Sequence, residues 1–202
     1  MGDCSEHGGD YYNCVPGVFN MRLAQEAGLA GLQNASIIGT YDLSCPFGVK
    51  TPLCPIGSVH NLNKTLVAAR AARALLSQMA PAAFPRVAFP RVVSVTAAPT
   101  GHGYWLVTAV FDEASLVLRG AQNCEACCGR GVGDFDASAD TTAWVNSTAP
   151  QQLSGGGVVF TVALAKKPVW VRYTANQAFP QCAVASAASG LPALPFLAAV
   201  AQ

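Results

Sequence analysis

Charged residues are scarce in this sequence. They make up 11% of the 202 residues, whereas a typical soluble chain carries about 25%. Lysines and arginines are scattered, and the formal net charge is +1. A nucleic-acid-binding chain would show clustered positive charge, so the sequence predicts no nucleic-acid partner.

Long hydrophobic runs are also missing, although hydrophobic residues make up 51% of the chain. The most apolar stretch, LPALPFLAAVAQ at 191–202, is broken by Pro192 and Pro195. It is much shorter than the roughly 20 apolar residues that a bilayer-spanning helix needs. The sequence therefore predicts no membrane span.

The N-terminus lacks the features of a secretory signal peptide. MGDCSEHGGDYYNC has neither a basic region nor an apolar core. The interior nevertheless resembles a secreted chain, with three N-glycosylation sequons, at Asn34, Asn63 and Asn146. These two observations agree if the natural N-terminal part of the protein is missing from this chain, and we expect that it is.

Cysteine is plentiful, and its even number favours disulfides in an oxidising compartment. The eight are Cys4, Cys14, Cys45, Cys54, Cys124, Cys127, Cys128 and Cys182. CEACC at 124–128 has the C-x-x-C spacing of a zinc or redox site, but two further zinc ligands are not close in the sequence. Disulfides of undetermined connectivity are therefore favoured, and no metal or cofactor is predicted.

The first part of the chain has the element order of one edge of an α/β domain. Apolar spacing predicts a short helix over 19–32 and a second helix over 61–79. Between them, ASIIGTYDL at 35–43 is β-branched and bounded by turn residues, which predicts a buried strand. The apolar stripe of the second helix is expected to face the core, with Arg70 and Arg73 lying off it.

The pattern changes after residue 80. A proline-rich stretch at 80–93 is a stiff connector, and we place a domain boundary between residues 83 and 84. Six later runs are short, β-branched or aromatic, and mostly separated by turn residues: 91–98, 104–112, 115–120, 141–148, 157–165 and 168–175. The fold prediction is the end of an α/β domain (1–83) followed by an all-β sandwich (84–202), with an extended tail at 190–196.

A histidine at a helix start raises the question of hydrolysis. His60 follows a glycine-containing turn ahead of the helix predicted over 61–79. It is either a base that takes the proton from a serine hydroxyl or a capping or surface histidine. No G-x-S-x-G nucleophile elbow exists in the chain. Asp42, at the end of the predicted strand, either orients the imidazole or caps the loop.

Aromatic residues in the predicted strands also allow two interpretations. They are either sugar-binding platforms or core residues: Tyr104, Trp105, Trp144 and Trp170. Arg172 alternates with Val171 and Tyr173, and we expect it to reach across a domain interface.

Four segments together resemble the sialate O-acetylesterase family, which are secreted or lysosomal esterases with an SGNH-type hydrolase domain. They are RLAQEAGLAGLQNASIIGTYDLS, FGVKTPLCPIGSVHNLNKTLVAARAARALL, SLVLRGAQNCEACC and VRYTANQAFPQCAVASAASGLPALPF, in order over most of residues 20–198. The resemblance implies that His60 is the catalytic histidine and that the substrate is an O-acetylated sialic acid or glycoconjugate. Asn61 stands where the family often has proline.

The same resemblance implies that the serine nucleophile and the oxyanion-hole residues lie in earlier segments, which this chain does not contain. The chain is then the C-terminal part of an SGNH-type hydrolase and inactive by itself, and the completed protein is secreted or lysosomal. The alternative from another class is a non-catalytic glycan-binding or structural β-sandwich. A disulfide-rich secreted module without a ligand is a third possibility.

Overall fold

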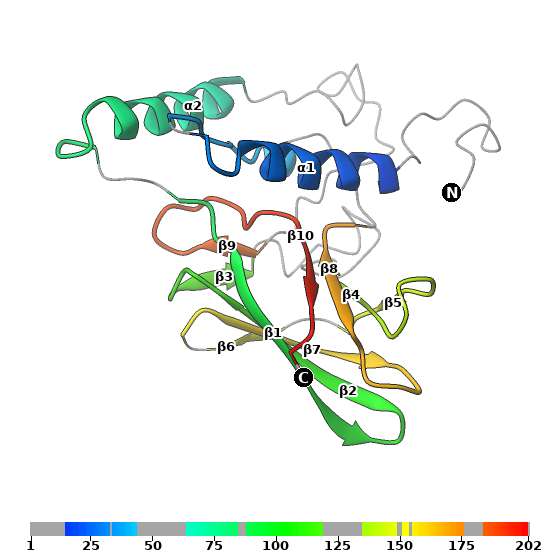
Figure 1. The fold of residues 1–202 in the computed structure, drawn as a ribbon. Helices are drawn as coiled ribbons and strands as arrows, with labels where there is room; N and C mark the ends of the chain where they lie inside the picture. The colour runs from blue at the N-terminus through cyan, green and yellow to red at the C-terminus, as the bar shows by residue number, and fades with distance from the viewer. Residues whose placement is uncertain are drawn as a thin grey trace, which may run out of the picture.

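The computed structural model describes residues 15–32, 34–43, 64–84, 88–118, 135–148, 151–153, 155–175 and 184–201. In these ranges the chain is mostly β-strand, with a smaller helical layer (Figure 1). The α/β character predicted for residues 1–83 and the boundary at 83/84 stay predictions. None of the described helices is both long and apolar enough to cross a bilayer.

Both predicted helices are present. Helix α1 spans Val15–Leu29 and helix α2 spans Lys64–Met79. Beyond α1, Gly31 has a φ of 83°. Glycine adopts this left-handed conformation without a Cβ penalty, so it suits a residue that follows a helix end.

The orientation of α2 differs from the prediction. None of its residues is buried, and its apolar stripe faces solvent, with Leu76 at 37% and Met79 at 73% exposure. The half-buried positions are instead Val67, Arg70, Ala74, Ser77 and Gln78. This spacing also follows the helical repeat, so α2 packs on the described residues through a more polar face.

The strand predicted over 35–43 is wrong. Residues 35–40 join no ladder in the described part of the chain, and Tyr41–Leu43 is a 3₁₀-helix, η2. Ile37 and Ile38 pack against a small buried cluster of Phe89, Leu191 and Leu194. The β-branched residues thus reflect burial of side chains, which does not require pairing of the backbone with a neighbouring strand.

Antiparallel sheets form the remainder. One has the order β1 (Val92–Gly101), β2 (Tyr104–Phe111), β7 (Gly157–Ala163), β6 (Gln151–Leu153), and another has β10 (Phe196–Ala199), β8 (Trp170–Tyr173), β4 (Phe135–Ser138), β5 (Val145–Asn146). A shorter pair joins β3 (Leu116–Leu118) to β9 (Val184–Ser186). Each of the six predicted runs contains a strand, and the β-rich character is confirmed.

The core lies between the two four-stranded sheets. Phe135 of β4 stacks on Phe160 of β7, with ring centroids 4.6 Å apart, and on its own sheet it lies 4.8 Å from Tyr173. Phe111 and Phe196 also meet across the sheets, at 6.0 Å. Burying each such ring is worth roughly 1.5–3 kcal/mol, so these aromatic contacts hold the two layers together.

The segment predicted as an extended tail, 190–196, is part of the folded body. Leu191, Ala193 and Leu194 are buried, and Phe196 opens strand β10. The amide of Ala193 donates to the Val184 carbonyl at 2.7 Å, and that of Leu194 donates to the Pro90 carbonyl at 2.9 Å. The intervening prolines have no N–H to satisfy, so the segment can be buried without leaving unpaired donors at those positions.

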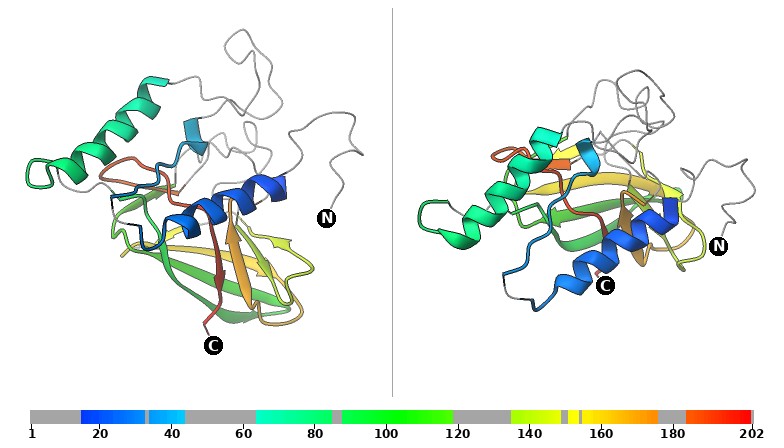
Figure 2. Two further views of the ribbon diagram at one scale, coloured as in Figure 1. Left: turned by 45° about the horizontal axis from the view of Figure 1, so that its top comes forward. Right: turned by 90° about the horizontal axis from the view of Figure 1, so that it is seen from above.

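The helical layer lies beyond one end of the sheets, as Figure 2 shows from two sides. Tyr41 of η2 is 5% exposed, and its hydroxyl donates to the carbonyl of Ala193. Arg91, at the start of β1, forms an ion pair with Glu26 of α1. These contacts place η2 and α1 against the residues that precede β1 and β10.

Candidate functional site

An ion pair between η2 and α2 is the main charged feature of the helical layer. Arg70 donates from Nη1 to Oδ1 of Asp42 at 2.7 Å and from Nη2 to Oδ2 at 2.8 Å. The side chains are 10% and 2% exposed, respectively. Arg70 Nη1 also donates to the Gly39 carbonyl. The planar guanidinium matches the two carboxylate oxygens, which fixes the direction in which the carboxylate points.

The carboxylate of Asp42 can accept more than one hydrogen bond. An ionised carboxylate offers about four lone-pair positions, and Arg70 donates one hydrogen bond to each oxygen. The sequence allows two roles for Asp42, orienting the imidazole or capping the loop. The structure adds a third role, because the pair with Arg70 anchors α2 to η2.

Several predicted site residues lie outside the described residues. They are His60, the replaced position Asn61, the sequon Asn63 and all eight cysteines. Their roles stay predictions. Within the described ranges, no group of three or more His, Cys, Asp or Glu side chains could hold a metal ion.

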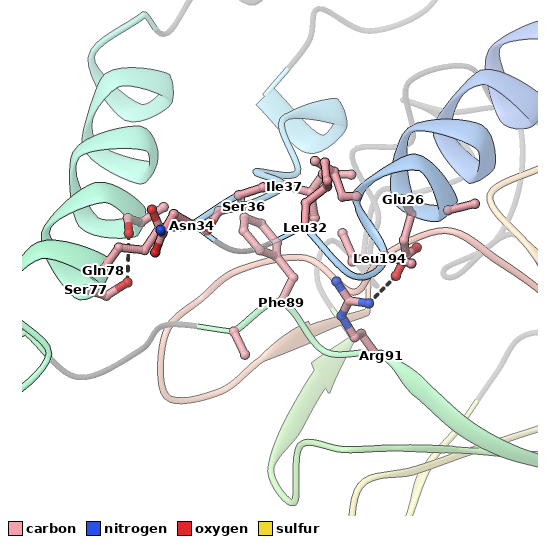
Figure 3. A pocket seen from close by; sticks show the side chains of 16 residues that line it. Glu26, Leu32, Asn34, Ser36, Ile37, Ser77, Gln78, Phe89, Arg91 and Leu194 are labelled. Atoms are coloured by element: carbon pink, nitrogen blue, oxygen red, sulfur yellow. Dashed lines mark hydrogen bonds and ion pairs between the residues drawn. The ribbon is translucent and has the colours of Figure 1, made fainter.

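A large open cavity of 780 Å³ lies between α1, α2 and the residues before β1 (Figure 3). Four of its polar side chains are paired with one another: Gln78 Nε2 donates to Ser36 Oγ at 2.5 Å, and Arg91 pairs with Glu26. Phe89 contributes an apolar surface. The charged groups on its wall neutralise each other.

A smaller cavity of 220 Å³ adjoins the Asp42–Arg70 pair. It lies between α2, which contributes Arg70 and Arg73, and the turn that carries Ser189 and Gly190. Its apolar wall consists of Leu43, Leu66, Phe89 and Leu191. Since the sequence of α2, KTLVAARAARALLSQM, holds basic residues and no acidic one, this cavity has a positive rim.

Two of the three predicted glycosylation residues are described, and both are exposed. Asn34 has a φ of 59° and lies at the wall of the larger cavity. Asn146 lies on strand β5. Exposure makes both side chains accessible, and their modification stays a prediction.

The four aromatic residues of the predicted strands differ in their surroundings, and Trp170 of β8 is half-buried. Trp105 packs against the core, and its indole N–H donates to the Leu164 carbonyl at 3.0 Å. Trp144 is covered by Arg172, whose guanidinium carbon lies 4.1 Å from the centroid of its ring. Tyr104 is 48% exposed, but one ring is not a platform. Trp105 is therefore a residue that packs on the core, which is one of the two interpretations that the sequence allows.

Within the described residues, Arg172 pairs with a carboxylate of its own sheet and not across the predicted domain interface. Its Nε donates to Oδ2 of Asp136, the neighbouring residue of β4, at 3.0 Å. Asp136 is fully buried. A buried carboxylate needs a partner charge, and the register of β4 and β8 supplies it within one sheet.

The sequence did not identify two residues of this region. One is Arg70, the partner of Asp42, and the other is Tyr41. Burial raises the pKa of Tyr41 well above its usual value, and the neighbouring Tyr173, whose hydroxyl lies 3.5 Å away, raises it further. The phenol is therefore neutral and acts as a hydrogen-bond donor. Its position directly before Asp42 was visible, but its partners lie about 130–150 residues away, beyond any local pattern.

Comparisons with known proteins leave the family open. No protein-family model matches the chain, and no curated protein matches it. Among solved structures, a carbohydrate acetylesterase from Xanthomonas citri matches with a TM-score of 0.48 and 20% identity, over 70% of this chain. The chain spans 29% of the length of that protein. At this identity and TM-score, the likeness establishes neither family nor activity.

Proposed function

We propose that this chain is the C-terminal portion of a carbohydrate esterase of the SGNH type, which removes O-acetyl groups from sialic acids when a serine-bearing segment completes it. The observation that carries the proposal is the fixed Asp42 carboxylate. The carboxylate is held by Arg70, which lies on α2, and α2 is the helix that follows His60 in the sequence.

The chain is long enough to bring His60 to this carboxylate. His60 precedes Lys64, the first residue of α2, by four residues, which span at most about 14 Å. Arg70 lies six residues into the helix, or about 9 Å along its axis. The length of the connecting chain therefore allows the imidazole to reach Asp42.

In this reaction, His60 takes the proton from the attacking serine and later returns it to the leaving sugar hydroxyl. Asp42 holds the imidazole in the tautomer that can accept the proton. Serine forms the bond to the acetyl carbon, and water then releases acetate. The serine and the oxyanion donors come from the completing segment.

The exposed side of α2 supports the idea that more protein packs there. Leu75 is 56% exposed, Leu76 37% and Met79 73%. Leu76 and Met79 belong to the apolar stripe that the sequence predicts for a buried helix face, and Leu75 is the neighbour of Leu76 in the sequence. A completing hydrolase segment would cover them and would bring its serine to the same layer as Asp42.

The imidazole tautomer of His60 tests the proposal on the isolated chain. Two-bond ¹H–¹⁵N NMR above neutral pH should show one tautomer for His60, because a carboxylate acceptor holds the proton on the nitrogen that faces it. The exposed His102 is the internal control and should show a mixture. In Asp42→Asn, the single tautomer should be lost, since an amide can donate as well as accept.

A tautomer mixture at His60 in the unmodified chain would contradict the proposal without any need for a variant. Acetate release gives a second arm of the same test. We expect none from the isolated chain on O-acetylated sialic acid, because its nucleophile is missing. Robust release by the chain alone would show that the assignment of the nucleophile to another segment is wrong.

A further inference from the structure

We propose that the 220 Å³ cavity beside Asp42 binds the carboxylate of an anionic monosaccharide, with Arg73 as the residue that receives it. This deepens the proposed function and rests on it, because it names the charged group by which that site would hold its substrate. It also makes a claim about binding that the isolated chain can test.

Charge is the first argument. Two arginines line the cavity, but Asp42 neutralises Arg70 through two hydrogen bonds. Arg73 forms no ion pair with any carboxylate of the described residues. Among the described residues, the positive charge of Arg73 is therefore not compensated by a carboxylate, which favours an anion over a neutral or cationic ligand.

Shape is the second argument. At 220 Å³, the cavity is smaller than the roughly 300–1,000 Å³ of pockets for drug-sized ligands, so we infer a ligand of about one sugar ring. Leu43, Phe89 and Leu191 line one wall. An apolar wall lowers the local dielectric constant and strengthens a charged hydrogen bond at its edge.

The opposite wall offers polar contacts for sugar hydroxyls. Ser189 Oγ accepts from the Leu191 amide at 3.2 Å, and its own hydrogen has no acceptor among the described residues. Gly190 has a φ of 68°, so the turn exposes backbone at the cavity without a Cβ. Arg73, with a guanidinium for the carboxylate, and Ser189, with a hydroxyl for the ring, thus line the same cavity.

The test titrates the intact chain with N-acetylneuraminic acid and follows amide shifts in ¹H–¹⁵N NMR. The matched probe is its methyl ester, which keeps the ring and removes the charge. We expect shifts at residues 189–191 and around Arg73, with the acid binding at least about tenfold more tightly than the ester, which equals about 1.4 kcal/mol.

Variants separate the cavity from general electrostatics. Arg73→Gln should weaken binding of the acid about tenfold, because it removes the charged donor. Lys64→Gln removes the same charge from the same helix without touching the cavity, and should leave binding unchanged. Equal binding of acid and ester, no binding of either, or equal weakening by both variants would overturn the inference.

The two proposals can fail separately. If the acid binds through Arg73 but His60 shows mixed tautomers, the esterase proposal fails and an anion-binding cavity is left. If His60 shows a single tautomer that depends on Asp42 and the acid does not bind, the esterase proposal stands and the cavity assignment is wrong.

Discussion

At the scale of single residues, the pairing of Asp42 with Arg70 combines a structural contact with a candidate site. A carboxylate that is 2% exposed cannot remain charged there without compensation. Arg70 provides it with two parallel hydrogen bonds and adds a third, to the Gly39 carbonyl. Lysine, with a point charge in place of a planar fork, could not make all three in this geometry.

Replacing Arg70 should therefore destabilise the chain strongly. Arg70→Met leaves the Asp42 charge buried without its partner, and we expect the free energy of unfolding to fall by about 3 kcal/mol. Urea denaturation followed by circular dichroism measures it. Arg73→Met, a change of the same type on the exposed side of α2, should stay within about 0.5 kcal/mol of the unmodified chain.

A double variant checks the cause. Arg70→Met combined with Asp42→Leu removes both charges, and should recover part of the loss because no uncompensated carboxylate remains. If the double variant is as unstable as Arg70→Met alone, packing of the arginine stem, and not its charge, explains the effect.

Asp42 could be singled out from the sequence, but its partner could not. Asp42 attracts attention because it follows a β-branched run just upstream of His60. Arg70 is one of three basic residues on α2, and nothing local distinguishes it from Arg73. Only the crossing of α2 over η2 decides which of them meets the carboxylate.

At the scale of elements, α2 shows the limit of reading a helix from its apolar stripe. The sequence predicts the helix correctly, since its residues are good helix formers with few β-branched positions. The stripe of large side chains faces solvent, however, while Val67, Arg70 and Ala74 face the chain. Periodicity predicts that one face of a helix is buried, but it does not predict which face packs on the rest of the chain.

Two of the strands that the sequence did not predict, β4 and β10, share a physical reason. Strand β4, with the sequence FDAS, is buried on both faces and contains Asp136 and Ser138, so it does not alternate in hydrophobicity. Strand β10 follows two prolines and resembles a loop. In both cases the segment becomes a strand because its backbone pairs with β8. Tertiary contacts thus override a weak local preference.

The turn after β4 makes a prediction of its own. A hydrogen bond from the Thr142 hydroxyl, and then those from the backbone amides of Thr142 and Ala143, lower the pKa of Asp140 to about 2. Because the pKa of Asp140 is lower in the folded state, its carboxylate stabilises the fold at pH values above 3.8, the unfolded pKa. This contribution is lost as the pH falls toward 2. The turn should therefore open in acid before the core does.

Carboxyl-detected NMR can measure this titration. In Thr142→Val, which removes the side-chain donor and keeps the backbone, the pKa of Asp140 should rise toward its unfolded value. Thr148→Val, which removes a hydroxyl that bonds Thr161 instead, is the control. An Asp140 titration that is unchanged in Thr142→Val would show that the hydroxyl does not contribute.

At the scale of the whole molecule, one tyrosine joins the helical layer to the sheets. Tyr41 donates to the carbonyl of Ala193, and its oxygen lies 3.5 Å from that of Tyr173 in β8. Tyr173 in turn accepts from the amide of Val184 in β9, at 2.9 Å. Two buried hydroxyls, which come from segments 132 residues apart, thus connect η2 to β8 and β9.

Alkaline unfolding should report this contact. Because the pKa of Tyr41 is raised in the folded state, its stabilising contribution is complete below the unfolded value of about 10 and is lost as the pH rises through the folded value. The melting temperature should therefore fall steeply above about pH 10. Tyr41→Phe should be less stable at neutral pH by about 1 kcal/mol and should show a shallower alkaline decline.

Tyr104→Phe is the matched control, since Tyr104 is 48% exposed and lies in β2, away from η2. Its alkaline profile should follow that of the unmodified chain. An equally steep decline in Tyr41→Phe would mean that another group governs the alkaline transition.

The sequence by itself determined the class of most elements, because helix propensity, β-branched runs and turn residues act locally. It also determined that the second part of the chain is β-rich, and it singled out Asp42. Only the tertiary structure decided that residues 35–43 pair with no described strand, that the segment from Leu191 to Phe196 is buried, and that Arg70 holds Asp42. The reason is physical: local interactions choose the conformation of a segment, whereas the partner of a buried charge or an apolar face depends on which distant residues the fold brings beside it.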